Sequence, residues 1–125
     1  MKIITKGNDF QYQLNIKDKD GDDISITMQN YYKILIYTDN PSVFIDVTNT
    51  LNAGNVLSVD CNLFRPLNSG QIHIKVMFSE TNPDFMDGKY DYLKIINTEY
   101  YYESETKGNI TGTAQYGYLY GSIED

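Results

Sequence analysis

Few side chains in this sequence could carry out chemistry, and two reactive types occur only once each. His73 and Cys61 are the single histidine and the single cysteine. One histidine and one thiol give no zinc-binding spacing, and His73 is the only histidine that could activate a nucleophile. His73 lies between Ile72 and Ile74 in an alternating segment, where its ring is expected to face solvent. The sequence therefore predicts no catalytic residue, no metal site and no cofactor, and hence a protein that is not an enzyme.

An acidic run around Gly21 has some features of a calcium-binding loop. If Gly21 takes the sixth loop position, Asp18 and Asp20 fall at ligand positions. The first and twelfth positions, which also need oxygen ligands, then hold Ile16 and Thr27. Because the pattern fails at both ends, a hairpin turn with Gly21 at positive φ explains the run better.

A second acidic group consists of Asp84, Asp87 and Asp91. Paired carboxylates can serve in glycoside hydrolysis. The steps Pro83-Asp84 and Asp87-Gly88 are typical of turns, however, and turn formation is the preferred interpretation.

Tyrosines near the C-terminus are candidates for a contact surface. The chain has 12 Tyr and no Trp, and half-buried strands can absorb most of these rings. In residues 116–121, tyrosines alternate with Gly and Leu, so the rings share one face of an extended segment. That segment could add to a sheet edge of a neighbouring subunit, or it could be the last strand of its own sheet. With the first edge strand included, the candidate interface residues are Tyr116, Tyr118, Leu119, Tyr120, Ile3 and Ile4.

The elements that position these residues follow from a two-residue alternation. Apolar and polar side chains alternate over residues 10–17 and again over 23–28, on either side of the turn at Gly21. Successive strand side chains point to opposite faces, so the pattern predicts a half-buried antiparallel hairpin. Residues 31–38 are apolar on both faces, which is typical of a central strand.

Turn signals roughly every ten residues separate the remaining strands, as in a β-sandwich. Further strands are expected at residues 2–5, 43–47, 56–59, 71–78, 89–97 and 100–103. The predicted fold is an all-β antiparallel sandwich of seven to nine short strands. Residues 1–106 would form the sandwich domain, and residues 107–125 a Tyr/Gly-rich C-terminal segment that could act as a docking strand.

Composition limits the partners. The 125 residues suit a single domain, and the net charge of −7 argues against nucleic-acid phosphates and anionic membrane surfaces. The first residues lack the apolar stretch of a signal peptide, and no segment approaches the roughly 20 apolar residues of a membrane span. We therefore expect a protein that is made and kept without export.

Four short stretches together resemble a known family. They are Gly7-Asn8-Asp9-Phe10, Leu14-x-Ile16-x-Asp18-x-Asp20-Gly21-x-x-Ile24, Ser69-Gly70-Gln71-Ile72-His73-Ile74 and Phe85-Met86-Asp87-Gly88-Lys89-Tyr90-Asp91. The set is similar to the immunoglobulin-like N-terminal domain of phage baseplate upper proteins. It is especially similar to versions in Bacteroides phages, including head-fibre-type structural proteins of crAss-like phages. The resemblance covers about residues 7 to 103 and implies an immunoglobulin-like sandwich.

The resemblance also implies a role. Domains of that family are adaptors that dock a fibre, spike or receptor-binding protein to the virion, usually as trimers, and they carry no catalytic residues. Because this chain stops soon after the domain, a base, collar or capsid-decoration role is expected. The protein would be assembled in the bacterial host cytoplasm, bind other virion proteins and reside in the virion. The alternative is a carbohydrate-binding module, in which tyrosine rings stack on sugars.

Overall fold

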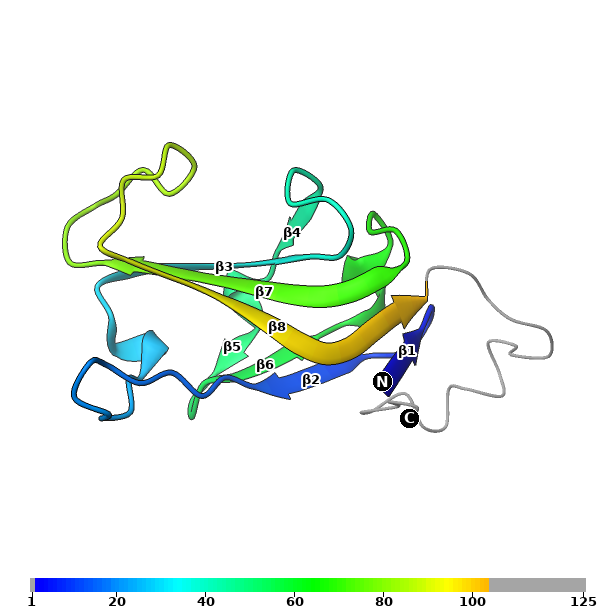
Figure 1. The fold of residues 1–125 in the computed structure, drawn as a ribbon, viewed down its shortest axis with the longest axis horizontal. Coiled ribbons are helices and arrows are strands. Elements are labelled where there is room, and N and C mark those ends of the chain that lie inside the picture. Colours follow the sequence, from blue (N-terminus) through cyan, green and yellow to red (C-terminus); the bar gives the residue numbers. More distant parts are fainter. Residues whose placement is uncertain (1, 104–125) are drawn as a thin grey trace.

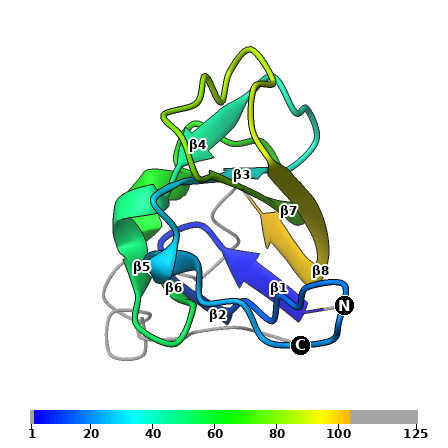
Figure 2. The same ribbon diagram turned by 90° about the vertical axis from the view of Figure 1, so that its left-hand side faces the viewer.

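The structure, a computed structural model, describes residues 2–103 and consists of two β-sheets packed face to face (Figures 1 and 2). The five-stranded sheet has the order β1 (Lys2–Thr5), β8 (Tyr92–Glu103), β7 (Gly70–Ser79), β3 (Tyr31–Tyr37) and β4 (Phe44–Asp46). The three-stranded sheet has the order β2 (Phe10–Gln13), β6 (Val56–Val59) and β5 (Leu51–Asn52). The all-β class and the two-layer sandwich are thus confirmed.

Short 3-10 helices interrupt the connections between strands. They are η1 (Ile26–Met28), η2 (Thr48–Thr50) and η3 (Cys61–Phe64). Within residues 2–103, no helix has the length and apolar character needed to cross a membrane.

The core lies between the two sheets, and the strand alternation accounts for most of it. Ile72, Ile74 and Val76 on β7 are fully buried, as their spacing predicts. On β3, residues 34–36 are all buried, so this strand is covered on both faces. It lies between β7 and β4, which confirms its interior position in the sheet.

Met77 departs from its predicted position. Alternation puts it on the outer face of the five-stranded sheet, yet its side chain is completely buried. The cover comes from the connection between β7 and β8, where Phe85 and Met86 fold back over that face. The outer face therefore has an apolar layer of its own.

An aromatic cluster joins the two sheets at one end of the sandwich. Phe10 on β2 contacts Phe64 of η3 and Tyr100 of β8 edge-on, with ring centroids 5.8 and 5.5 Å apart. Tyr102 of β8 stacks on Phe64 at 5.0 Å. Tyr12 also reaches Tyr100, at 5.8 Å. Rings thus hold the C-terminal half of β8 against β2, with edge-to-face and stacked geometries that add to the burial energy.

Strand β1 pairs differently from the rest of the sandwich. It lies parallel to β8, with Lys2 opposite Tyr100 and Thr5 opposite Glu103, whereas the other strand pairs are antiparallel. The expectation of a purely antiparallel sandwich is therefore wrong for this one pair. No turn joins β1 to β8, and so no hairpin dictates their direction. Burial of Ile4 in the core anchors β1 instead.

The predicted hairpin of residues 10–17 and 23–28 forms only at its tip. Lys17 and Asp23 make a β-bridge, and the Ile24 N–H donates to the Ile16 carbonyl at 2.8 Å. The chain then enters η1, and β2 pairs with β6 instead of residues 23–28. Met28, assigned by alternation to the inner face, is 79% exposed.

The last two predicted strands, residues 89–97 and 100–103, are one continuous strand. β8 runs through residues 98 and 99, and its pairing with β7 shifts register between Gln71 and His73. Thr98 sits at this irregularity, fully buried, with its hydroxyl donating to the Ile72 carbonyl at 2.7 Å. The hydroxyl therefore has a hydrogen-bond partner although it is buried, and β8 continues through the irregularity.

Ile4→Ala is expected to lower the free energy of unfolding by about 2–5 kcal/mol, because it removes a fully buried side chain from the core. Ile3→Ala is the matched control: Ile3 lies beside it on the same strand but is only half-buried, so its loss should be clearly smaller. Urea denaturation of both variants measures the difference. Equal losses would contradict the placement of β1.

Candidate functional site

A pocket of about 310 Å³ lies on the outer face of the five-stranded sheet. We call it the outer-face pocket. It is lined by Leu35, Tyr37, Pro41, Ser42, Phe44, Lys75, Met77, Phe85, Met86 and Ile95. Its volume falls at the small end of the range for ligand pockets, and its lining is mainly apolar.

The floor of the outer-face pocket is one row of side chains across three neighbouring strands. Leu35 on β3 is opposite Lys75 on β7, and Lys75 is opposite Ile95 on β8. Lys75 is half-buried and is the only charged side chain in the lining. The pocket thus combines apolar walls with a single ammonium group. It suits a ligand or partner segment in which an apolar group lies next to an acidic or hydroxyl group.

Residues 80–91 connect β7 to β8 and supply one wall of the outer-face pocket. Asp84 fixes the shape of this connection. Its Oδ1 accepts hydrogen bonds from the backbone N–H groups of Met86 and Asp87, at 3.2 and 3.1 Å. Its carbonyl accepts one from Lys89 at 2.9 Å, and Gly88 supplies the positive φ of 79°. The turn interpretation of this acidic group is therefore confirmed.

Asp84 and Asp87 also perturb one another. A shared side-chain hydrogen bond lowers the pKa of Asp84 and raises the pKa of Asp87. Both carboxyl groups are exposed and neither lines the outer-face pocket. Asp91 caps the other end of the connection by accepting the Glu80 N–H at 3.1 Å, which lowers its pKa. These carboxylates accept backbone hydrogen bonds that hold the turn.

His73 lies one row away from the pocket floor, on the face where it was predicted. Its ring stacks on Tyr37 with centroids 5.0 Å apart, and Nδ1 is 2.8 Å from the Asn97 Oδ1. The contacts of the His73 ring with Tyr37 and Asn97 are those of a residue that packs on the protein surface.

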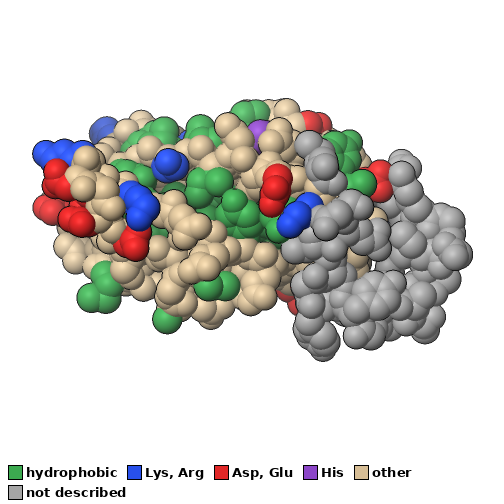
Figure 3. Space-filling model, turned by 60° about the horizontal axis from the view of Figure 1, so that its bottom comes forward, with side chains coloured by type: hydrophobic (Ala, Val, Ile, Leu, Met, Phe, Trp, Pro, Cys, Tyr) green, Lys and Arg blue, Asp and Glu red, His purple; other side chains and the backbone are tan. Residues whose placement is uncertain are grey.

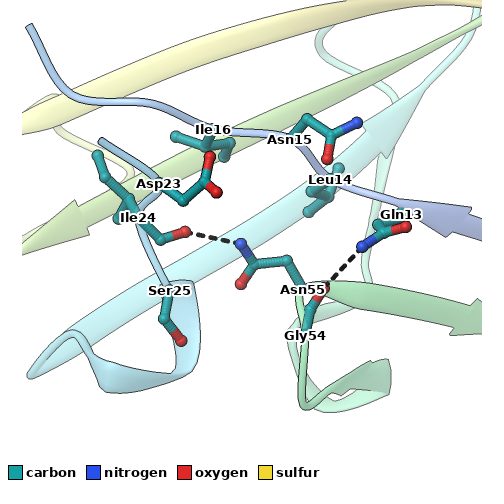
Figure 4. Close-up of a pocket in the computed structure, with 9 residues that line it drawn as sticks. All are labelled: Gln13, Leu14, Asn15, Ile16, Asp23, Ile24, Ser25, Gly54 and Asn55. Carbon is teal, nitrogen blue, oxygen red and sulfur yellow. Dashed lines mark hydrogen bonds between the residues drawn. The ribbon is translucent and has the colours of Figure 1, made fainter. Parts of the chain in front are cut away.

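A second, more polar pocket of about 270 Å³ lies beside the incomplete hairpin (Figure 4). Asn55 forms its centre, with a backbone φ of 61°. Its side-chain NH₂ donates to the Ile24 carbonyl at 2.7 Å, and its Oδ1 accepts the Ile26 N–H at 2.9 Å. The Asn55 amide thus pairs with backbone groups of residues 24 and 26 that would bond to a neighbouring strand in a hairpin. Residues 23–28 therefore need no strand partner.

The acidic run at Gly21 is a turn held by one carboxylate. Asp18 Oδ1 accepts hydrogen bonds from the N–H groups of Asp20 and Asp22, at 2.9 and 3.0 Å. Gly21 has a φ of 86°, and Lys17 pairs with Asp23 at 2.7 Å. The hairpin-turn interpretation is confirmed here.

Asp9, Asp60 and Cys61 form a cluster that the sequence pattern did not predict. Their ligand atoms lie within 4.8 Å of one another. Asp9 Oδ1 accepts the Cys61 N–H at 2.9 Å, and Asp60 Oδ1 accepts the Asn62 N–H at 2.8 Å, so both carboxylates tie down the start of η3. Burial raises the pKa of the Cys61 thiol, and the two neighbouring carboxylates raise it further. A protonated thiol is a poor ligand and a poor nucleophile.

The predicted interface residues are only partly within the described structure. Tyr116, Tyr118, Leu119 and Tyr120 lie outside residues 2–103. Ile3 is half-buried on β1, whereas Ile4 is a core residue whose side chain has no exposed surface.

The outer-face pocket was not predicted, although the sequence holds a signal for it. Leu93 and Ile95 fall on one face of β8 while Ile96 falls on the other, so this strand is apolar on both sides. Both faces of an apolar strand require cover. Leu93 and Ile95 nevertheless remain 42% and 44% exposed.

Comparison of the chain with known protein families, with curated proteins and with solved structures found no match.

Asn55→Gly is expected to lower the free energy of unfolding by about 1–3 kcal/mol, because the backbone groups of residues 24 and 26 lose their partner. Asn55→Ala should cost roughly 1 kcal/mol more, since alanine is strained at positive φ. Asn15→Ala, an exposed change in the same pocket, should alter stability by less than about 0.5 kcal/mol. Thermal denaturation compares the three, and equal effects would contradict the bridging role.

Alkylation of Cys61 should rise with pH around a midpoint above the ordinary thiol range of about 8–9, because burial and two carboxylates disfavour the thiolate. Asp60→Asn keeps the cap on η3 but removes one charge, so its midpoint should move down toward the ordinary value. Iodoacetamide labelling followed by mass spectrometry measures both. A wild-type midpoint at or below the ordinary range would refute this assignment.

Proposed function

We propose that this protein is a structural adaptor of a phage virion, without enzymatic activity, which docks other virion proteins through its β-sandwich. The outer-face pocket carries the proposal. Around it, Met86, Leu93 and Ile95 remain 59%, 42% and 44% exposed. Large exposed apolar side chains grouped on one face are typical of protein contact surfaces.

The strand order supports the finer proposal of an immunoglobulin-like fold. If β2 to β8 correspond to strands B, C, C′, D, E, F and G, the two sheets have the orders B-E-D and G-F-C-C′. These are the two sheets of an immunoglobulin-like sandwich that has a C′ strand. β1 would then be the first strand, crossing over to lie beside G. We propose this correspondence, which matches the fold that the resemblance implies.

Residues in the stretches that carry the resemblance lie at a turn, at a ring contact of the core and at a close approach of the backbone. Gly7 has a φ of 99° where the chain leaves β1 for β2, and Phe10 begins the aromatic cluster. Gly70 packs so closely on Thr38 that an added Cβ would lie 3.2 Å from its side chain. These positions give the motifs a structural reason, and they are compatible with the proposed immunoglobulin-like fold.

The proposed partners are other virion proteins and further copies of this chain, with a trimer favoured. The net charge of −7 disfavours nucleic acid and anionic membranes as partners. The proposed location is the virion, after assembly in the host cytoplasm.

Carbohydrate binding is the second candidate, and the aromatic rim of the outer-face pocket favours it. Tyr37, Phe44 and Phe85 line the same cavity as Lys75. Aromatic faces with a few polar groups suit a sugar ring.

Mass spectrometry of phage particles purified from cells that produce this protein tests the adaptor role. The chain should be present at a fixed ratio to the capsid and tail proteins and should remain through a density gradient. A host cytoplasmic enzyme serves as the contamination control. Particles that contain the other structural proteins but lack this chain would refute the proposal, and glycan-array binding lost in Tyr37→Ala would then support the second candidate.

A further inference from the structure

We propose that the open edge of β8, residues 92–99, is an acceptor site for a β-strand, and that its occupant is the Tyr-rich segment 116–121 of a second copy of this chain. The inference deepens the proposed function, because it rests on an adaptor that assembles through a docking strand. It assigns that strand a defined acceptor.

β8 has a neighbouring strand along most of its length on one side only. β7 lines one edge of β8, whereas β1 covers the other edge only at residues 100–103. Residues 92–99 therefore present an edge that has no strand partner within the described part of the chain. Every second residue of such an edge directs its N–H and C=O groups outward, ready to pair with another strand.

This open edge is long compared with the others in the two sheets. The outer strands β1, β2, β4 and β5 have four, four, three and two residues. Short edge strands protect a sheet against pairing with strands of other molecules. A long open edge lacks this protection and is usually covered by another segment or a partner. Figure 3 views the molecule from the side of β8 and β2, where hydrophobic side chains reach the surface between the charged ones.

The side chains along the open edge suit an added strand with apolar groups on its outer face. Leu93 and Ile95 lie on the outer face of β8, opposite Met77 and Lys75 of β7. They are 42% and 44% exposed, and a neighbouring strand about 4.8 Å away would cover them. Ile95 is also a wall of the outer-face pocket, so large rings on the added strand could extend toward that pocket.

Lys94 makes the edge selective. It is opposite Val76, a core residue, so it stands on the core-facing side of β8, yet it is exposed at the rim. A charged residue on this side of an edge strand opposes indiscriminate pairing, because an apolar strand would desolvate it. A strand that docks here needs small side chains or an acidic group near Lys94.

The sequence of residues 116–121 suits both requirements. Paired as a strand, the segment would place Tyr116, Tyr118 and Tyr120 on one face, over Leu93 and Ile95. The opposite face would carry Leu119 between Gly117 and Gly121, and a register that sets either glycine beside Lys94 leaves room for the ammonium group.

A second copy is the better source of the docking strand than the same chain. β1 already pairs with β8 at residues 100–103, the end at which the chain leaves the sheet, so the open part of the edge begins on the far side of β1. A strand from a second copy can approach residues 92–99 directly. A donor strand at one place and an acceptor edge at another make a head-to-tail contact, which closes into a ring when the rotation allows it.

Light scattering of the full chain tests the inference through Ile95→Glu. The wild-type protein should have a molar mass of at least two chains of 14.4 kDa, and Ile95→Glu should reduce it to the monomer, because the added charge meets the docking strand. Val43→Glu is the control, since Val43 is 38% exposed next to β4 at the far edge of the same sheet. It should leave the oligomer intact. The triple variant Tyr116→Ser, Tyr118→Ser, Tyr120→Ser should also be monomeric.

Three outcomes would overturn the inference. A monomeric wild-type chain excludes strand exchange between copies. An oligomer that survives Ile95→Glu places the contact elsewhere, and one that survives the triple variant excludes the Tyr-rich segment as the occupant. Circular dichroism confirms that each variant is folded. None of these results changes the outcome of the particle analysis, so failure of this inference is distinguishable from failure of the adaptor role.

Discussion

The aromatic cluster between the two sheets is the constraint on which the rest of the sandwich depends. Phe10 on β2 is packed between Phe64 and Tyr100, and Tyr102 stacks on Phe64. These rings join the three-stranded sheet to the C-terminal half of β8, which is also the half that β1 pairs with. Since the cluster fixes this half of β8 in the core, it determines which half of the strand stays uncovered.

The two halves of β8 consequently have different roles. The C-terminal half is a structural strand with neighbours on both sides. The N-terminal half pairs with β7 alone, and the stacking of Tyr92 on Phe78 of β7, with ring centroids 4.1 Å apart, adds to that contact. Its outer side chains continue into the outer-face pocket. A stable half that supports a partly exposed half is the arrangement expected of a docking element, because the open edge then needs no reorganisation before it binds.

Local patterns in the sequence were enough to predict most strands, the acidic turns and the buried face of β7. They could not show that residues 23–28 leave the sheet, because the cause is the side chain of Asn55, which is distant in sequence. The parallel pairing of β1 and the cluster of Asp9 with Cys61 depend on the same kind of long-range contact. The outer-face pocket was not predicted because alternation places Met77 on the outer face of the sheet. Its burial depends on residues 80–91, whose position the local pattern does not show.

Residue-resolved amide hydrogen exchange along β8, measured on the full chain at several protein concentrations, tests whether the open edge is the docking site. Amides of residues 100–103 should be protected at every concentration. Amides of residues 92–97 that do not bond to β7 should exchange freely in dilute protein and become protected as copies assemble. Exchange at residues 92–97 that does not change with concentration while the chain assembles would show that the open edge is not the docking site.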